Sequence, residues 1–314
     1  MIIRWGLDEL PDLLAELGVA RAFLIASDRW QLDVPHAARW SEVPSHRVQV
    51  PPEADGILAL GGGSAIDTGK LASAQSDLPL VSVPTTYSGA EWTTFYGIRS
   101  PDRRMRGGSA GAHPAGIVYD VDLTLGLPPA ESAGTAMNAL AHCAEALYVR
   151  GRSPEGDEQA LAGAPLIAQE MPRVLDDGRD RVAREQLLRG AMHAGHALGL
   201  AGLGLAHAMA QALGGAYGLP HGAMNALTLP PALAFNRAVA PDEVGRFGDA
   251  IGGDAVGRVR ELARLGGFDR LRDFGVPEDE LPAVAELAAA RGGNLANPRQ
   301  AMPEEILELL RTIY

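Results

Sequence analysis

The sequence is poor in cysteine and in positive charge. Among its 314 residues Cys143 is the only cysteine, which excludes an intramolecular disulfide and a metal cluster held by several thiolates. There are 27 lysines and arginines against 39 aspartates and glutamates, and the formal net charge of -12 argues against general binding to nucleic acid or anionic membranes. A small anionic substrate stays compatible with this charge, because a local cationic pocket can exist in an acidic protein.

Long apolar runs are also missing. No stretch approaches the ~20 residues that a membrane-spanning helix needs, and the first residues, MIIRWGLDELPDLLAELG, lack the cationic start and apolar run of a secretion signal. A single cysteine suits a reducing compartment. We therefore expect a cytoplasmic protein that binds neither membranes nor nucleic acids.

The first part of the chain alternates short apolar runs with helical patterns. Such alternation is typical of a parallel sheet with helices on its faces. Between Asp28 and Asp55 the pattern is weak, and no helix is expected there. Strands are predicted at 21–26, 56–60, 79–83 and 116–120, and helices at 8–18 and about 65–75.

The pattern changes after LPPAES at 127–132. Alanine and leucine then recur at helical spacing, and almost no strand signal remains. Helices are predicted at 133–150, 158–170, 179–200 and 202–213. The sequence therefore predicts an α/β domain over residues 1–128 and an all-helical domain over residues 129–314.

Three glycines stand between a predicted buried strand and a helix in GILALGGGSAIDTGK, residues 56–70. Glycines let the backbone turn sharply and approach a phosphate, and the start of a helix attracts negative charge. Ser64 is expected to cap the helix, with Asp67 as its capping-box partner. The segment matches neither a P-loop nor GxGxxG. A tight turn without a ligand is the alternative.

Three of the eight histidines stand out by their surroundings. Asn138 and His142 lie four residues apart and share one face of a predicted helix. His207 lies in another helical segment, and His221 follows in what is expected to be a loop. Two imidazoles and such a polar pair can hold a divalent metal if they converge. The alternative is that each histidine is hydrogen-bonded within the core.

Taken together, these segments resemble the iron-containing alcohol dehydrogenase family. The matching motifs are GGGSAID, PTTYSGAEWT, VYDVDLTLGLP, MNALAHCAEALY, GLAHAMAQALGGAYGLPHGAMNALTLP and NPR, in order from about residue 55 to 299. The PTTYSG, MNALAH and LTLGLP segments are similar to the maleylacetate reductase branch. The chain departs from the family between Asp28 and Asp55, where a strand–helix unit would normally sit.

The resemblance implies a Rossmann-like dinucleotide-binding domain followed by an all-helical domain, the dehydroquinate synthase-like architecture, with the cofactor in the cleft between them. Asp28 matches an acid placed against the adenosine ribose, which favours NAD(H) over NADP(H) because a carboxylate repels a 2′-phosphate. Asp67 would lie near the nicotinamide, and Arg104 is the nearest match to a family lysine. The other implied cofactor-binding residues are Gly61, Gly62, Gly63, Ser64, Thr85, Thr86, Ser88 and Thr94.

Metal-using members bind iron or zinc through an aspartate and three histidines. The matching residues here are Asn138, His142, His207 and His221. Asparagine is neutral and a poorer ligand than carboxylate, so we expect weak metal binding. Without metal, the three histidines would be the catalytic residues that bind substrate carboxylates or polarise a carbonyl. Gln211 replaces a further family histidine and cannot act as an acid or base near neutral pH.

The resemblance implies an NAD(P)H-dependent oxidoreductase that reduces maleylacetate or a related small oxo acid by hydride transfer. A homodimer that acts on a small carboxylate or aldehyde is expected. One alternative is an alcohol or aldehyde dehydrogenase of other specificity, and a second is a non-catalytic nucleotide-binding relative. A dehydroquinate-synthase-like lyase would be a different class of enzyme, and it would normally need an intact metal site.

Overall fold

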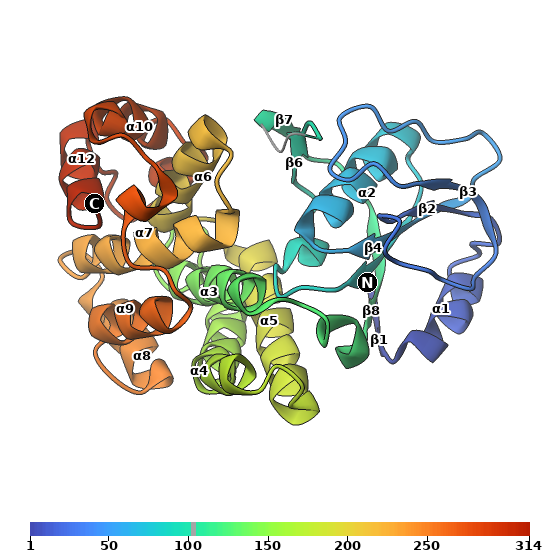
Figure 1. The fold of residues 1–314 in the computed structure, drawn as a ribbon, viewed down its shortest axis with the longest axis horizontal. Helices are drawn as coiled ribbons and strands as arrows, with labels where there is room; N and C mark the ends of the chain where they lie inside the picture. The colour runs from blue at the N-terminus through green and yellow to red at the C-terminus, as the bar shows by residue number, and fades with distance from the viewer. Residues whose placement is uncertain (102–104) are drawn as a thin grey trace. The chain divides into compact units, whose positions relative to one another are not determined.

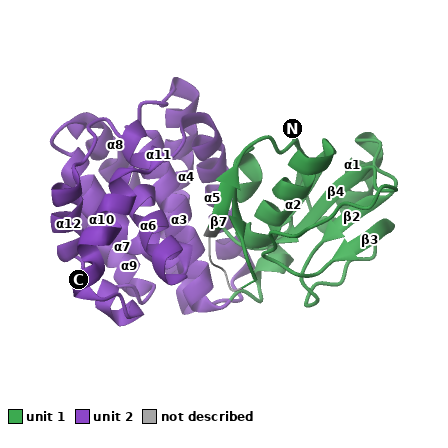
Figure 2. Ribbon diagram, turned by 90° about the horizontal axis from the view of Figure 1, so that it is seen from above, with its two compact units in different colours: residues 1–127 green, residues 128–314 purple. Residues whose placement is uncertain are grey.

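The computed structural model describes residues 1–101 and 105–314 (Figure 1). The chain divides into two compact units, Met1–Leu127 and Pro128–Tyr314 (Figure 2). The first unit is built around a parallel sheet, and the second contains helices. This α/β unit followed by an all-helical unit confirms the fold class that the sequence predicts.

The sheet of the first unit has six strands, and every neighbouring pair is parallel. Parallel strands covered on both faces carry continuous apolar runs, which explains why the central strands were predictable from the sequence. The strands, in spatial order, are β1 (Ile2–Trp5), β8 (Pro114–Tyr119), β5 (Leu80–Pro84), β4 (Gly56–Gly61), β2 (Ala22–Ile25) and β3 (His36–Trp40).

One helix covers each face of this sheet. Leu58 and Val81 pack with the leucines of α1 (Leu10–Glu16), whereas Ile57 and Leu80 pack with Leu71 of α2 on the opposite face. Successive strand residues point to opposite faces, so each strand contributes to both cores. The helix α2 spans Gly63–Ser76 and starts directly after β4.

The structure contains strands that the sequence analysis missed. The edge strands β1 and β3 are only half-buried and lack the long apolar run of a central strand. A separate antiparallel hairpin joins β6 (Tyr96–Arg99) to β7 (Met105–Ser109). The predicted helix 8–18 is shorter than expected, because a 3-10 turn at Leu7–Glu9 precedes α1. Residues 41–55 form no helix, as expected.

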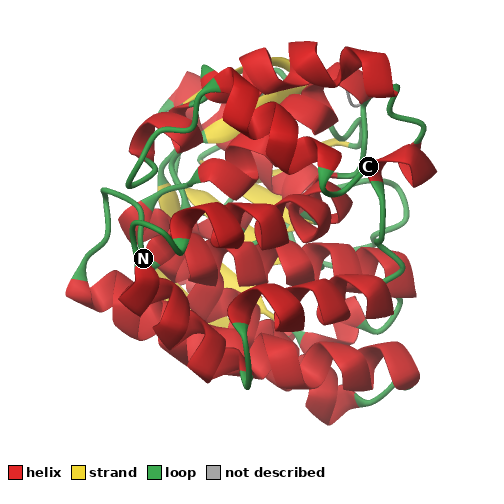
Figure 3. Ribbon diagram, turned by 90° about the vertical axis from the view of Figure 1, so that its left-hand side faces the viewer, coloured by secondary structure: helices red, strands yellow, loops and turns green. Residues whose placement is uncertain are grey.

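The second unit is described throughout and contains helices but no strand between residues 128 and 314 (Figure 3). Side chains of Ser153, Asp180 and Asp254 cap α4, α5 and α9 by accepting backbone N–H groups. The α-helices are α3 (Pro129–Ala146), α4 (Pro154–Asp176), α5 (Arg181–Ala201), α6 (Leu205–Tyr217), α7 (His221–Asn236), α8 (Pro241–Ile251), α9 (Ala255–Leu265), α10 (Leu281–Ala289), α11 (Gly292–Ala296) and α12 (Pro303–Arg311).

Within the described residues, no single helix is long and apolar enough to cross a membrane. The helices α5 and α6 meet the length and composition criteria only as a pair, and that pair is bent by 99°.

Glycine allows α4 and α5 to pack closely. A Cβ atom added to Gly163 would lie 2.8 Å from the backbone oxygen of Gly190 and 3.0 Å from Cβ of His193. Backbone atoms cannot move aside as a flexible side chain can. The two helices would therefore have to separate to accept any larger residue.

We predict that Gly163→Ala lowers the free energy of unfolding by about 1–3 kcal/mol, the usual cost of overpacking a core. The matched control is Gly245→Ala in α8, where a Cβ would meet nothing within 4 Å. There the helix should gain about 1 kcal/mol from the better propensity of alanine. Urea unfolding measures both, and equal stability changes in the two variants would contradict the close packing of α4 and α5.

Candidate functional site

The glycine loop joins β4 to α2 in the first unit. Gly61 has a φ of 150°, a conformation that favours glycine, and Gly62 is the N-cap of a helix that begins at Gly63. The expected capping box of Ser64 and Asp67 is wrong, because the glycines allow the chain to turn into the helix before Ser64 is reached. No side chain caps this helix start.

The loop lies against the segment that follows β5. A Cβ atom on Gly62 would come within 2.9 Å of Thr86 Cγ2, and one on Gly63 within 3.4 Å of Ser88 Oγ. The first N–H groups of a helix have no intrahelical acceptor, and together with the helix dipole they attract an anion. The bare glycine backbone therefore offers a cradle in which a phosphate can approach the helix start.

Two hydroxyl groups beside this cradle, those of Thr85 and Thr86, are buried and have no hydrogen-bond partner among the described residues. Thr85 is held in place by its backbone, whose N–H donates to Gly61 O at 3.0 Å. A buried hydroxyl without a partner is unfavourable, and a polar ligand would remove that cost. These observations fit the dinucleotide that the family implies.

Three further residues were predicted to bind the cofactor. Asp28 is exposed in the turn that follows β2, and Thr94 is exposed between β5 and β6. Arg104 lies outside the described residues. The structure brings the three glycines, Ser64, Thr85, Thr86 and Ser88 together. Asp28 follows β2, which pairs in parallel with β4, the strand that leads into the glycine loop.

Asp67 faces the hairpin side of α2 and is paired with a residue that the sequence analysis missed. Its carboxylate accepts the backbone N–H of Gly97 at 3.2 Å and lies 3.7 Å from Nζ of Lys70. Lys70 is 1% exposed and donates to Thr93 Oγ1 at 2.6 Å and to the Phe95 carbonyl at 3.0 Å. Burial raises the pKa of Asp67 and lowers that of Lys70. Through these hydrogen bonds, Asp67 and Lys70 hold residues 93–97 against α2, the helix that follows the glycine loop.

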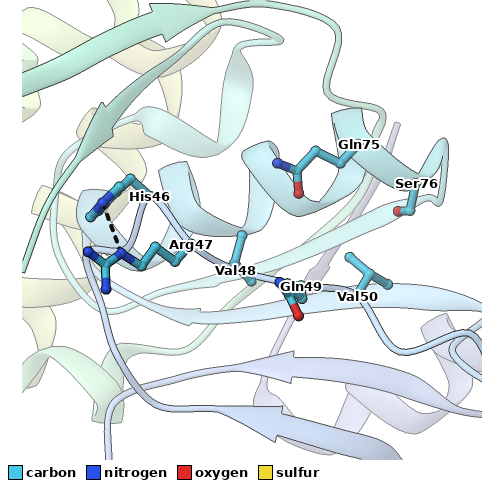
Figure 4. A pocket seen from close by; sticks show the side chains of 7 residues that line it. All are labelled: His46, Arg47, Val48, Gln49, Val50, Gln75 and Ser76. Carbon is cyan, nitrogen blue, oxygen red and sulfur yellow. Dashed lines mark hydrogen bonds between the residues drawn. The ribbon is translucent and has the colours of Figure 1, made fainter.

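An open pocket of about 620 Å³ also lies on the first unit, where His46, Val48 and Gln49 run beside Gln75 and Ser76 (Figure 4). The last two residues stand at the C-terminal end of α2, roughly 20 Å along the helix from the glycine loop at 1.5 Å per residue. The pocket is therefore not part of the phosphate cradle.

In the second unit, the neighbouring helices α3, α6 and α7 bring the predicted histidines together. The rings of His142 and His207 are stacked with centroids 4.8 Å apart and planes at 17°, and His221 lies 5.6 Å from His207. His142 is 3% and His207 1% exposed. The expected loop position of His221 is wrong, because Pro220 is the N-cap and His221 is the first residue of α7.

Glu145 orients His207 and was missed in the sequence. Its carboxylate is fully buried and accepts Nδ1 of His207 at 2.6 Å and the backbone N–H groups of Gly204 and His207 at 2.8 and 3.2 Å. This bond leaves Nε2 of His207 facing Asn138, whose Oδ1 lies 3.2 Å away. The sequence contained a signal for Glu145, because Asn138, His142 and Glu145 follow the i, i+4, i+7 spacing that places side chains on one face of a helix.

Asn225 is a second missed residue, and it links the two ends of the cluster. Its Nδ2 donates to Asn138 Oδ1 at 2.7 Å and lies 3.1 Å from Nε2 of His221, four residues earlier on α7. Within the part of the chain that the structure describes, Asn225 Oδ1 and His142 Nδ1 are buried and have no hydrogen-bond partner. Two polar atoms are therefore available to a ligand within this cluster.

The arrangement does not fit a divalent metal ion. Among the described residues there is no group of three or more histidine, cysteine, aspartate or glutamate side chains that could hold one. Asn138 Oδ1 accepts from Asn225 and lies against Nε2 of His207, and Nδ1 of His207 is bound to Glu145. Amides, imidazoles and the Glu145 carboxylate form a hydrogen-bonding cluster instead.

Comparisons with known proteins find family models that match each of the two units. The model of the family described as iron-containing alcohol dehydrogenase matches residues 46–121, and that of the C-terminal part of the Fe-containing alcohol dehydrogenase family matches residues 132–314. Maleylacetate reductase of Pseudomonas knackmussii is 36% identical over 83% of this chain and 74% of its own length. Maleylacetate reductase 1 of Rhodococcus opacus is 33% identical over 98% of this chain and 84% of its own.

Solved structures show the same likeness. The crystal structure of maleylacetate reductase from Agrobacterium tumefaciens superimposes with a TM-score of 0.87 and 30% identity, and the match covers 100% of this chain and 95% of that one.

The burial of His142 makes stability depend on pH. Burial, together with the neighbouring His207 and His221, lowers the pKa of His142 well below its ordinary 6.5. As the pH falls below 6.5 the unfolded chain takes up a proton on this histidine while the folded chain does not. The resulting stability is therefore present above pH 6.5 and is lost as the pH falls.

We predict that the free energy of unfolding of the wild type falls between pH 7.5 and pH 5, and that His142→Asn flattens this dependence. His36→Asn, at an exposed histidine of β3, is the matched control and should leave the dependence unchanged. Urea unfolding at several pH values measures the slope. A slope that is the same in His142→Asn and in the wild type would mean that His142 is protonated in the folded state.

Proposed function

Because this chain belongs to the Fe-containing alcohol dehydrogenase family and is an oxidoreductase, we propose that it reduces maleylacetate or a related small oxo acid with NADH. Residues 1–128 would bind the dinucleotide and residues 129–314 the substrate. The observation that carries the proposal is the cluster of three histidines and two neutral amides, which suits an anionic substrate better than a cation. The maleylacetate reductases among its relatives point to the same substrate class.

The glycine loop supports the cofactor assignment. Gly61, Gly62 and Gly63 would hold the pyrophosphate at the start of α2, where backbone N–H groups and the helix dipole favour negative charge. The unpartnered hydroxyls of Thr85 and Thr86 would donate to the bound dinucleotide. When bound, NADH supplies a hydride to an alkene or carbonyl carbon of the substrate.

The histidine cluster would handle the charge that the hydride creates. As hydride adds, the electron pair moves onto oxygen, and the resulting enolate or alkoxide has to be stabilised and protonated. Because the Glu145 carboxylate accepts the Nδ1–H of His207, Nε2 is the nitrogen that would supply this proton, which requires His207 to enter the step as imidazolium. His142, kept neutral by burial, would hydrogen-bond the substrate, and His221 would bind a carboxylate.

The direct test is NADH oxidation, followed at 340 nm, with maleylacetate and with a panel of uncharged aldehydes. Faster turnover of maleylacetate supports the proposal. Turnover confined to the aldehydes would instead indicate an alcohol or aldehyde dehydrogenase of other specificity. Tight NADH binding without oxidation by any of these compounds would indicate a non-catalytic relative.

We predict that NADH binds more tightly than NADPH, because the carboxylate of Asp28 would repel a 2′-phosphate. Asp28→Ser should reduce the preference. Gly62→Leu should abolish binding of both, since even a Cβ atom would come within 2.9 Å of Thr86. Gly253→Leu, at a glycine with nothing within 4 Å, is the control. Fluorescence titration measures the affinities, and equal affinity for the two cofactors would mean that Asp28 does not contact the ribose.

We further predict that His207→Ala and His221→Ala each lower kcat/KM for maleylacetate by on the order of 100-fold or more, the scale expected when a positioned proton donor is lost. Gln211→Ala, on the same helix as His207, is the matched control and should change kcat/KM much less. Wild-type activity in the His207→Ala, His221→Ala double variant would place the chemistry elsewhere.

A further inference from the structure

A second pocket in the helical unit has no role in the proposed reaction. Its volume is about 490 Å³, within the range of roughly 300–1,000 Å³ that small-molecule sites occupy. It lies where α9 and α12 pack on α7. The residues that line it are Ala226, Leu227, Pro230, Arg260, Ala263, Arg264, Phe268, Asp269, Arg270, Arg272, Glu278, Arg311, Thr312, Ile313 and Tyr314.

The rim of this pocket is strongly basic in a chain whose net charge is -12. Five arginines line it, against only two acidic side chains. Asp269 is shared, because it lies 2.8 Å from Nε of Arg264 and 3.7 Å from Nε of Arg270. The guanidinium group of Arg260 forms no hydrogen bond or ion pair with another described residue. Like charges brought together in this way repel one another unless an anion joins them.

Apolar side chains form the floor of the pocket, beneath a lining that is mostly polar. Ala226, Leu227 and Pro230 on α7, with Ala263 on α9 and Phe268, are buried residues whose surfaces face the same hollow. A purely ionic ligand would leave the apolar side chains of the floor exposed to solvent. A purely apolar ligand would leave the arginines without an anionic partner. The lining therefore suits a molecule with an apolar body and more than one negative charge.

The pocket is separate from the histidine cluster, although both use α7. His221 and Asn225 lie four residues apart on one face of the helix. Ala226 and Leu227 follow at about 100° and 200° around the helix axis from Asn225, at 3.6 residues per turn. They therefore open onto a different side of α7.

We propose that this pocket binds a small organic anion that carries at least two negative charges, a phosphate ester or a dicarboxylate, on an apolar body. The guanidinium groups of Arg260, Arg264 and Arg270 bind its charged oxygens, since planar N–H forks match carboxylate and phosphate geometry. Leu227 and Phe268 contact its apolar part. The site lies outside the catalytic cluster and does not depend on the reaction proposed above.

Isothermal titration of the NADH-saturated protein with phenyl phosphate tests this proposal, with inorganic phosphate as the comparison ligand. We expect one phenyl phosphate per chain, bound more tightly than inorganic phosphate. The Arg260→Gln, Arg270→Gln double variant should bind at least about 10-fold more weakly, as expected for the loss of two charge-assisted hydrogen bonds. The control is Arg258→Gln, on the same helix but paired with Glu261 outside the pocket, and it should stay within about twofold of the wild type.

Three results would overturn the proposal: no binding to the wild type, equal binding to the double variant, or inorganic phosphate bound as tightly as phenyl phosphate. The last result would show that surface charge acts without the apolar floor. If the double variant melts at a lower temperature than the wild type, the single variant Arg264→Gln repeats the test at the third arginine that binds the ligand. It should also weaken binding severalfold, and unchanged binding in that variant would equally contradict the proposal.

Discussion

The buried carboxylate of Glu145 is the interaction on which the histidine cluster depends. A charge removed from water is costly unless it is paired and hydrogen-bonded. Here α6 supplies the partners, through the backbone N–H groups of Gly204 and His207 and through Nδ1 of the His207 ring. Because α3 carries Glu145, the same contacts join the two helices and fix the direction in which His207 points. A Cβ atom at residue 204 would lie 2.9 Å from Oε1 of Glu145, so glycine is required for this close approach.

Apart from Glu145, the polar side chains of the cluster are amides and imidazoles. Asn138 and Asn225 form a direct amide contact at 2.7 Å where the family resemblance implies a cation site built on a carboxylate. The Asn138 amide oxygen already accepts an N–H of Asn225 and lies 3.2 Å from Nε2 of His207, so it has little left to offer a metal, whereas imidazole and amide N–H groups can donate to carboxylates. The same substitution therefore disfavours a metal and favours an anionic substrate, which links the local hydrogen bonding to the proposed reaction.

The parts of the fold that the sequence predicted are those with strong local periodicity. The central strands and the long helices carry apolar residues at the spacing of their own geometry. The edge strands β1 and β3 were missed because half-buried positions need no apolar run. The cap at Ser64 was wrong because flexible glycines let the helix begin earlier than a capping residue would dictate.

The candidate site also contains residues that local motifs predicted and residues that only the packed structure identifies. Asn138, His142, His207 and His221 were predicted from motifs and do converge. Glu145, Asn225 and Lys70 were not identified, because their partners lie far away in the chain: Gly204 and His207 for Glu145, Asn138 for Asn225 and Thr93 for Lys70. Helical spacing could have placed Glu145 beside His142, but only the packed helices reveal what it binds.

We propose that the reduction needs no bound metal. The most direct test is kcat/KM for maleylacetate reduction before and after exhaustive dialysis against EDTA. The metal content of the same samples would be measured by mass spectrometry. We predict less than one equivalent of iron or zinc before dialysis and an unchanged kcat/KM afterwards, since Asn138 offers no anionic ligand. Loss of activity on dialysis that added iron or zinc restores would contradict the claim and make the histidines metal ligands.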